Sequence, residues 1–270
     1  MIICFVGGGN MASALIGGML GKGYAAQQVR VVEINDASRT HLEQTFGVRA
    51  VAELASGIAG SDIIVLAVKP QQLREVAQQL EPLLGAQLII SIAAGIRATD
   101  IARWLGTQRI VRAMPNTPAL VHSSITGLYA LPGVDHTLCE SAGAILSAVG
   151  STVWLDDESM MDALTAVSGS GPGYVFYFIE ALQQAAWDLG FDTDTGRRLA
   201  VETFLGAARL ASSSSEGAEI LRARVTSRNG TTERALLSME AEQVKSHIVE
   251  AVKRAANRSR ELGDELGNAP

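Results

Sequence analysis

The chain of 270 residues has little cysteine, few aromatic side chains and no excess of basic residues. Its two cysteines, Cys4 and Cys139, lack the paired spacing of a disulfide framework or a zinc site, so we expect two buried thiols and no metal. Lys and Arg total 22 against 28 Asp and Glu, and the formal net charge of -6 provides no basic face for nucleic acid. We therefore expect small molecules and further copies of the chain as partners.

The sequence also lacks a basic leader and a long apolar run. The apolar residues 1–6 carry none of the positive charge of a signal peptide, and no uninterrupted run approaches the length of a membrane span. These features predict a cytoplasmic protein without a membrane partner. The hydrophobic content of 47% is instead enough for a well-buried core in one large domain or two modest ones.

The first half does contain a regular alternation of short apolar runs with helix-periodic segments. This alternation is typical of a doubly wound parallel sheet, in which strands are buried on both faces. Strands are predicted over residues 2–6, 29–33, 62–68, 87–93 and 109–113, with further strand-like stretches at 126–130 and 152–155.

From Met160 onward the pattern is helical only. Helices are predicted over 160–167, 172–189, 194–212, 217–224 and 232–265. The acidic stretch 156–159 is a plausible boundary. We therefore predict an α/β fold class: an N-terminal Rossmann-like doubly wound sheet, residues 1–157, followed by an all-α C-terminal domain, residues 158–270.

A glycine-rich turn follows the first predicted strand. Gly7 and Gly9, with Ala12 three residues on, have the spacing of the dinucleotide fingerprint, in which the first glycine permits the turn and the second admits the pyrophosphate. Gly8 completes the turn, and Asn10 and Met11 begin the helix. A tight turn without a ligand is the alternative interpretation.

Glu33 ends the second predicted strand, about 20 residues after the fingerprint, where a carboxylate binds a ribose 2′-hydroxyl. A carboxylate there resists a 2′-phosphate, yet Asn35, Ser38 and Arg39 lie just beyond and could receive that phosphate. The choice between NADH and NADPH is therefore open. A solvated strand end is the alternative role for Glu33.

Further strand ends carry small or polar residues, at the edge of the sheet where ligands of such folds bind. We interpret Lys69 as a positioning charge more than as a catalytic acid. Asn116 stands in a rigid loop between two prolines, which can carry it toward a cofactor or form a plain turn. The candidates for cofactor binding at these strand ends are Val68, Lys69, Pro70, Ala93, Ala94 and Asn116.

Two uncharged clusters rich in glycine and hydroxyl groups, residues 166–174 and 225–232, each precede a helix-periodic run. Backbone N–H groups and hydroxyls at such positions suit a small anion, although Thr231 and Thr232 could simply cap the last helix. The candidates for substrate binding are Ser168, Gly169, Ser170, Ser227, Asn229, Gly230, Thr231 and Thr232.

These motifs occur in the order seen in pyrroline-5-carboxylate reductases, and the chain resembles that family over essentially its whole length. The most specific stretches are Ser168-Gly169-Ser170-Gly171-Pro172 and Val225 to Thr232. The resemblance implies an enzyme, an oxidoreductase that transfers hydride from NADPH or NADH to the C=N carbon of 1-pyrroline-5-carboxylate. The product is L-proline, in the last step of proline biosynthesis.

The resemblance also implies roles for individual residues. Thr232 is the catalytic candidate, because it would hydrogen-bond the ring nitrogen, and the turn from Ser227 to Thr231 would bind the carboxylate. Residues 168–172 would form the floor of the substrate site, and Ala93, Ala94 and Asn116 would place the nicotinamide.

The chain departs from the family pattern in three places. Arg228 stands where the family usually has proline, and Leu54 stands where many members have an asparagine of the adenosine pocket. The acid that commonly lies upstream of the second cluster has no clean counterpart, with Glu216 as the nearest candidate.

A predicted helix at 172–189 is apolar around most of its circumference, which predicts burial against a second subunit in a homodimer or a higher assembly of dimers. Its apolar residues are Tyr174, Val175, Phe176, Phe178, Ile179, Leu182, Ala185, Ala186 and Leu189.

Two other classes of protein remain alternatives. Hydroxyacid and ketopantoate dehydrogenases pair a catalytic lysine with an asparagine four residues on. Lys253 and Asn257 share that spacing, although a solvated helix face explains it better. The other alternative is a non-catalytic NAD(P)-binding protein.

Overall fold

A computed structural model describes residues 1–267 of the chain, which divides into two compact units. The first unit comprises residues 1–170 together with the described residues from Ala255 onward, and the second comprises residues 171–254. The two units divide after Ser170, whereas the sequence predicts a domain boundary after Asp157. That domain boundary stays a prediction.

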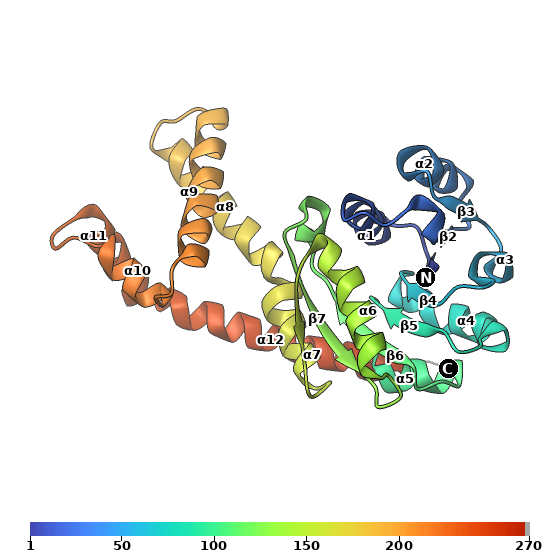
Figure 1. The fold of residues 1–270 in the computed structure, drawn as a ribbon. Coiled ribbons are helices and arrows are strands. Elements are labelled where there is room, and N and C mark those ends of the chain that lie inside the picture. The colour runs from blue at the N-terminus through green and yellow to red at the C-terminus, as the bar shows by residue number, and fades with distance from the viewer. Residues whose placement is uncertain (268–270) are drawn as a thin grey trace. The chain divides into compact units, whose positions relative to one another are not determined.

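The first unit is built on a sheet with the strand order β3-β2-β1-β4-β5-β6-β7-β8 (Figure 1). Neighbouring strands are parallel except β6 and β7, which are antiparallel. The strand order reverses direction between β1 and β4, which is the switch point where such sheets bind ligands. The strands are β1 (Ile3–Val6), β2 (Val29–Val32), β3 (Arg49–Val51), β4 (Ile63–Leu66), β5 (Leu88–Ser91), β6 (Ile110–Met114), β7 (Ser124–Ala130) and β8 (Gly150–Trp154).

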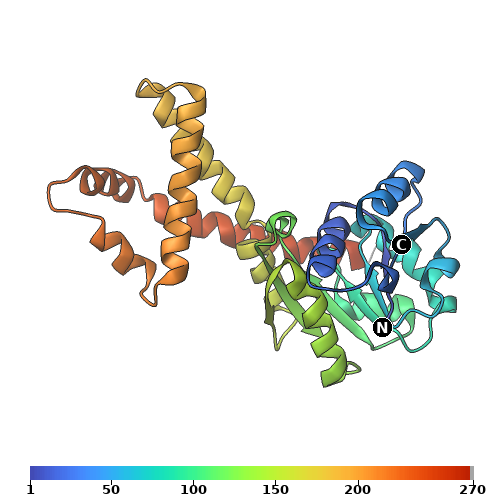
Figure 2. The ribbon, with the colours of Figure 1, turned by 45° about the horizontal axis from the view of Figure 1, so that its top comes forward.

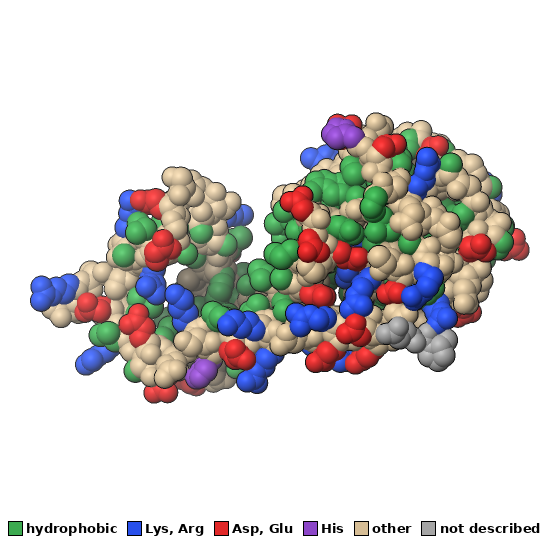
Figure 3. All heavy atoms as spheres, turned by 90° about the horizontal axis from the view of Figure 1, so that it is seen from below, with side chains coloured by type: hydrophobic (Ala, Val, Ile, Leu, Met, Phe, Trp, Pro, Cys, Tyr) green, Lys and Arg blue, Asp and Glu red, His purple; other side chains and the backbone are tan. Residues whose placement is uncertain are grey.

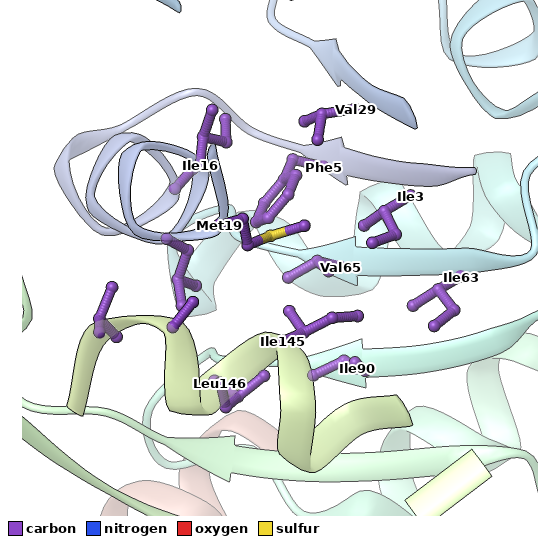
Figure 4. Packing of buried hydrophobic residues seen from close by; sticks show 14 of the residues in the cluster. Ile3, Phe5, Ile16, Met19, Val29, Ile63, Val65, Ile90, Ile145 and Leu146 are labelled. Carbon is purple, nitrogen blue, oxygen red and sulfur yellow. The ribbon is translucent and has the colours of Figure 1, made fainter. Parts of the chain in front are cut away.

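Helices cover both faces of this sheet because successive side chains of a strand point to opposite faces. Phe5 of β1 belongs to one buried cluster with α1 and α6 (Figure 4), whereas Cys4 belongs to a second cluster with α4 and α5. The doubly wound sheet of the predicted fold class is confirmed. The helices are α1 (Asn10–Gly21), α2 (Asp36–Phe46), α3 (Leu54–Ile58), α4 (Pro70–Leu80), α5 (Ala98–Leu105), α6 (His136–Leu146) and α7 (Met160–Leu164).

The second unit is helical. It contains α8 (Gly171–Asp188), α9 (Thr193–Ser213), α10 (Ala218–Arg224), α11 (Thr231–Ala241) and the first half of α12 (Val244–Gly267). Helices α8 and α9 run side by side as a hairpin (Figure 2). The single helix predicted over 232–265 is wrong, because the chain breaks at Gln243, whose backbone takes a left-handed conformation (φ 53°).

The second half of α12 packs within the first unit. Ser259 is buried and donates to Asp162 Oδ1 at 2.7 Å, and Arg97 pairs with Asp264 at 2.5 Å. A Cβ on Gly263 would lie 3.1 Å from the carbonyl oxygen of Gly95, so this glycine lets the helix approach the turn after β5 closely. The pattern of residues 232–265 predicted a helix here but not this contact.

Apolar side chains reach the surface of the second unit among charged ones (Figure 3). Phe176 and Tyr177 of α8 are 65% and 70% exposed, and Leu189 just beyond it is 80% exposed. Few residues of this unit are buried within it, namely Ala186, Gly196 and Ala200. The helical bundle therefore leaves much apolar surface that its own residues do not cover.

Candidate functional site

The turn between β1 and α1 is shaped by its glycines. Gly7 has φ 103°, and a Cβ there would lie 2.7 Å from the carbonyl oxygen of Ala67 at the end of β4. A Cβ on Gly8 would lie 2.6 Å from Leu42 Cδ1, whereas Gly9 faces open space within 4 Å. Gly7 is required by its backbone conformation and by the neighbouring strand end, Gly8 is packed against the Leu42 side chain, and Gly9 leaves room for a ligand against the backbone.

The N-terminus of α1 follows directly and has no side-chain cap. Gly9 is the N-cap residue, and the first turn, which begins with Asn10 and Met11, carries no acidic side chain. The N–H groups of this turn and the positive end of the helix dipole therefore suit a phosphate. This geometry fits the pyrophosphate of a dinucleotide.

A cavity of about 530 Å³ opens beside this turn at the switch point of the sheet. It brings together six of the predicted cofactor residues, namely Gly7, Gly8, Gly9, Glu33, Val68 and Lys69. It also has an apolar wall that the sequence analysis did not identify. Leu54, the departure from the family pattern, lies in the cavity wall. The wall is formed by Val32, Ile34, Ala52, Leu54 and Val76.

The Glu33 carboxylate lies against the glycine turn. Gly8 N–H donates to its Oε2 at 2.9 Å, and Asn35 N–H donates to its Oε1 at 2.8 Å. The Arg39 guanidinium points elsewhere: it donates to the carbonyl oxygens of Glu33 and Ile34 and pairs with Asp36 at 2.7 Å. Glu33 thus lines the cavity, whereas Arg39 stabilises the backbone of the turn between β2 and α2 through its hydrogen bonds.

Lys69 and Pro70 stand at the N-terminus of α4. Lys69 is the N-cap residue and exposed, and Pro70 takes the first helical position, where its missing N–H costs no hydrogen bond. Among residues 1–267, no ion pair of Lys69 is present. Its ammonium group is therefore available to a ligand phosphate at the cavity.

Ala93 and Ala94 follow β5, and only the second is exposed. Gly95 after them has φ 78°, and a Cβ there would contact Leu262 and Leu266 of α12. The turn after β5 is thus held between the sheet and the second half of α12. The placement of a flat ring at these small side chains stays a prediction.

Asn116 joins two of the predicted motifs. Its Nδ2 donates to the carbonyl oxygen and to Oγ of Ser168, both at 3.2 Å, and its Oδ1 accepts from Ser124 Oγ at 2.9 Å and from Ile125 N–H at 3.2 Å. The side chain is 8% exposed. Its amide is therefore used by contacts within the protein, where it holds the Ser168 turn.

The first hydroxyl-rich cluster forms a π-helical turn over Thr165–Gly169. Ser170 N–H donates to the Thr165 carbonyl oxygen at 2.8 Å, and a Cβ on Gly169 would lie 2.7 Å from Met114 Cε at the end of β6. Single π turns inside α-helices are frequent at functional sites. The predicted residues Ser168, Gly169 and Ser170 thus lie beside the carboxyl end of a strand of the sheet.

A buried ion pair supports the same end of the sheet and was not predicted. Arg112 Nη1 lies 2.8 Å from Glu158 Oε1, which also accepts from Ala98 N–H at the start of α5 at 2.7 Å. Arg112 is 4% exposed. Arg112, which stands among apolar residues inside the predicted strand 109–113, was the available signal, since a buried charge requires a partner.

The second cluster forms a turn that ends at α11, in the second unit. Asn229 takes a left-handed conformation (φ 59°), its N–H donates to Glu233 Oε2 at 2.7 Å, and Gly230 N–H donates to the Ser227 carbonyl oxygen at 3.0 Å. Gly230 is the N-cap residue of α11 and has no side chain to cap it. The alternative in which Thr231 or Thr232 is the N-cap residue is therefore wrong, and both lie in the first turn instead.

Other candidates have ordinary structural roles. Glu216 pairs with Arg224 through a hydrogen bond of 2.6 Å. Lys253 and Asn257 both lie on α12, where Asn257 accepts from Arg260 at 3.3 Å. Within the described residues, no cluster of three or more potential ligands for a metal ion occurs. None of the helices over residues 1–267 combines the length and the apolarity needed to cross a membrane.

The fold and the site define a class, a Rossmann-type dinucleotide-binding protein with an added helical unit. A family model described as pyrroline-5-carboxylate reductase dimerisation matches residues 158–262, and one described as NADP oxidoreductase, coenzyme F420-dependent, matches residues 2–95. The chain belongs to the pyrroline-5-carboxylate reductase family, as the resemblance predicted.

Relatives match over nearly the whole chain. The pyrroline-5-carboxylate reductase of Pseudomonas aeruginosa is 46% identical over 98% of each chain, and pyrroline-5-carboxylate reductase 2 of Bacillus subtilis is 33% identical over 99% of this chain and 97% of its own. Among solved structures, a pyrroline-5-carboxylate reductase from Coxiella burnetii has a TM-score of 0.91 at 38% identity, covering 96% of this chain and 97% of its own. The Plasmodium falciparum pyrroline carboxylate reductase, solved with NADP bound, has a TM-score of 0.87 at 27% identity, with 97% and 98% covered.

Proposed function

We propose that the chain is an NAD(P)H-dependent oxidoreductase that reduces 1-pyrroline-5-carboxylate to L-proline, the last step of proline biosynthesis. The proposal rests on one observation. This member of the family has both a dinucleotide site and an uncapped, hydroxyl-rich turn at the start of α11. The first provides for a reduced nicotinamide cofactor, and the second provides neutral donors for a small carboxylate.

The chemistry of the substrate agrees with such a turn. The substrate is a small ring with one carboxylate and one imine, and the bound dihydronicotinamide supplies a hydride to the C=N carbon. Because the imine accepts hydride best when it is already protonated, the protein needs no strong general acid. The N–H groups at a helix N-terminus, with roughly half a positive charge, hold a carboxylate without an arginine.

Most of the predicted residues then have a defined task. The Thr232 hydroxyl hydrogen-bonds the ring nitrogen and accepts from its N–H when the imine is protonated, and Ser227, Asn229, Gly230 and Thr231 hold the carboxylate. Ser168, Gly169 and Ser170 shape the floor of the substrate site. On the cofactor side, Gly7, Gly8, Gly9, Asn10, Met11 and Lys69 contact the phosphates, Glu33 contacts the ribose, and Ala93 and Ala94 leave room for the nicotinamide.

We further propose that residues 158–270 form a helical dimerisation and substrate domain and that the protein is a cytoplasmic homodimer or an assembly of dimers. The exposed apolar side chains of the second unit and the match to a dimerisation family model support this proposal.

The test is the oxidation of NADH and NADPH by the purified protein with pyrroline-5-carboxylate. The controls are NADH and NADPH oxidation with 2-ketopantoate, and NAD+ and NADP+ reduction with a 3-hydroxy acid. We expect turnover with pyrroline-5-carboxylate and formation of proline. Turnover with 2-ketopantoate or oxidation of the 3-hydroxy acid alone would assign the chain to the other dehydrogenases, and cofactor binding without any turnover would make it a non-catalytic NAD(P)-binding protein.

A further inference from the structure

The cavity beside the glycine turn contains one carboxylate at the position where NADH and NADPH differ. From its surroundings we infer that the chain selects NADH over NADPH and that Glu33 is the specificity-determining residue. The inference deepens the proposed function and rests on it for the class of cofactor. Its basis is the hydrogen bonding of Glu33, the charge of the cavity and the engagement of Arg39, the cation that the sequence offered to a 2′-phosphate.

The Glu33 carboxylate is held in place as an acceptor for hydroxyl groups. The N–H groups of Gly8 and Asn35 each donate to a different oxygen of this carboxylate, at 2.9 and 2.8 Å. Each carboxylate oxygen keeps a further lone pair, so both can still accept from a ribose hydroxyl. Because Gly8 also belongs to the turn that faces the pyrophosphate, the carboxylate stands at the adenosine ribose of a dinucleotide bound there.

The cavity is also unfavourable to additional negative charge. The charged residues in its wall are Glu33, Glu75 and Lys69. A phosphate monoester brings a charge of about −1.5 to −2 at neutral pH. Lys69 follows β4 and Glu33 follows β2, with β1 between them, so two strand spacings of about 4.8 Å separate the two positions. At about this separation, one Debye length, Lys69 offsets only part of the repulsion between Glu33 and a 2′-phosphate.

Arg39, the cation that could receive a 2′-phosphate, is engaged elsewhere. Its guanidinium donates to the carbonyl oxygens of Glu33 and Ile34 at 2.8 and 2.9 Å and pairs with Asp36 at 2.7 Å. It does not belong to the residues that line the cavity. Moving it to a phosphate would break these three hydrogen bonds and leave Asp36 without its partner.

The other candidates for the phosphate are engaged as well. Asn35 is the N-cap residue of α2, and its Oδ1 accepts from Ser38 N–H at 2.9 Å. This bond uses an N–H group that an uncapped helix would offer to an anion, and Asp36 adds negative charge to the same turn. The Asn35 side-chain oxygen, the Ser38 N–H and the Arg39 guanidinium are therefore each occupied by a contact within the protein.

The test compares the dissociation constants of NADH and NADPH for the full chain, measured by fluorescence titration without substrate. We expect NADH to bind at least about tenfold more tightly, a difference of about 1.4 kcal/mol. Glu33→Gln removes the charge and keeps the size. It should lower the ratio of the NADPH dissociation constant to the NADH dissociation constant by about tenfold or more, and Glu33→Ser should do the same. Thermal unfolding of each variant establishes that it is folded.

Two matched variants make the test specific. Glu75→Gln removes the other acidic charge of the cavity wall, and Arg39→Ala removes the neighbouring cation; neither should change the ratio by more than about threefold. The inference is overturned if the unaltered chain binds NADPH as tightly as NADH, if Glu75→Gln shifts the ratio as much as Glu33→Gln, or if Arg39→Ala selectively weakens NADPH. Because binding is measured without substrate, a failure of turnover with pyrroline-5-carboxylate would count against the proposed function and leave this result standing.

Discussion

Thr232 stands in the first turn of α11, directly after a glycine that cannot cap the helix. We expect Thr232→Val to raise the barrier that kcat/KM for pyrroline-5-carboxylate reports by about 1.5–4 kcal/mol, because the variant loses the hydroxyl that hydrogen-bonds the ring nitrogen and keeps the shape of the side chain. The dissociation constant of the cofactor should change little. Steady-state kinetics and a cofactor titration measure both quantities.

Thr137→Val serves as the control, because Thr137 is exposed on α6 of the first unit. Kinetics of Thr232→Val within about twofold of the unaltered protein, like those of the control, would show that Thr232 has no part in catalysis.

Cys4 is fully buried in the centre of the sheet, and burial raises the pKa of its thiol from an ordinary 9.0 to about 12. Above pH 9 the unfolded chain loses this proton while the folded chain keeps it. The folded state therefore binds more protons, and the free energy of unfolding falls by up to about 1.4 kcal/mol per pH unit between pH 9 and 12.

Cys4→Ala should remove this contribution and flatten the alkaline fall in stability, measured by urea unfolding at pH 9 and pH 10. Cys139→Ala is the matched control, because Cys139 is only partly buried and should change the slope less. Equal slopes for the Cys4 variant and the unaltered chain would contradict the predicted protonation of the buried thiol.

At the scale of elements, Asn116 links the loop after β6 to the π-helical turn at Thr165–Gly169. Asn116→Asp keeps the size of the side chain but turns an oxygen toward the Ser168 carbonyl oxygen. We expect a loss of stability of about 1–3 kcal/mol, because two acceptors then face each other in a buried site. We also expect a higher KM for pyrroline-5-carboxylate, because the Ser168 turn loses its support.

Ser168→Ala provides the comparison for the stability measurement. It removes one acceptor of Asn116 Nδ2 but leaves the carbonyl oxygen in place, so its urea unfolding should show a smaller loss than that of Asn116→Asp. An Asn116→Asp protein as stable as the unaltered chain would show that the link does not hold the turn.

Local patterns were sufficient for most elements of the first unit, because its strands are apolar runs that two layers of helices cover. They were insufficient for β3 and α3, which are too short to show a period, and for Gln243, whose left-handed backbone splits one apparent helix into α11 and α12. The glycine turn was predictable because the spacing of its glycines is enough to specify a strand, a tight turn and a helix. The engagement of Asn116 with Ser168 was not, since it joins positions 52 residues apart.

At the scale of the whole molecule, the exposed apolar residues of the second unit predict self-association. The unaltered chain should show at least twice its mass of 28.4 kDa by light scattering at micromolar concentration. Phe176→Glu should lower this mass, because the side chain is 65% exposed on α8 and a charge there would have to be buried against the second copy.

Leu83→Glu is the control, at an exposed apolar position (41%) of the first unit, and it should leave the measured mass unchanged. An active monomer of 28.4 kDa would contradict the proposed dimer.

The passage of α12 from the second unit into the first has a consequence for the order of synthesis. Residues 255–267, which provide Ser259 and Gly263 to the first unit, leave the ribosome only after the whole second unit has been made. Gly95 and Asp162 must therefore wait for contacts that lie about a hundred residues or more further along the chain. During translation the sheet can form early, but the first unit closes late, and in that interval the surface reserved for α12 is open to chaperones and to aggregation.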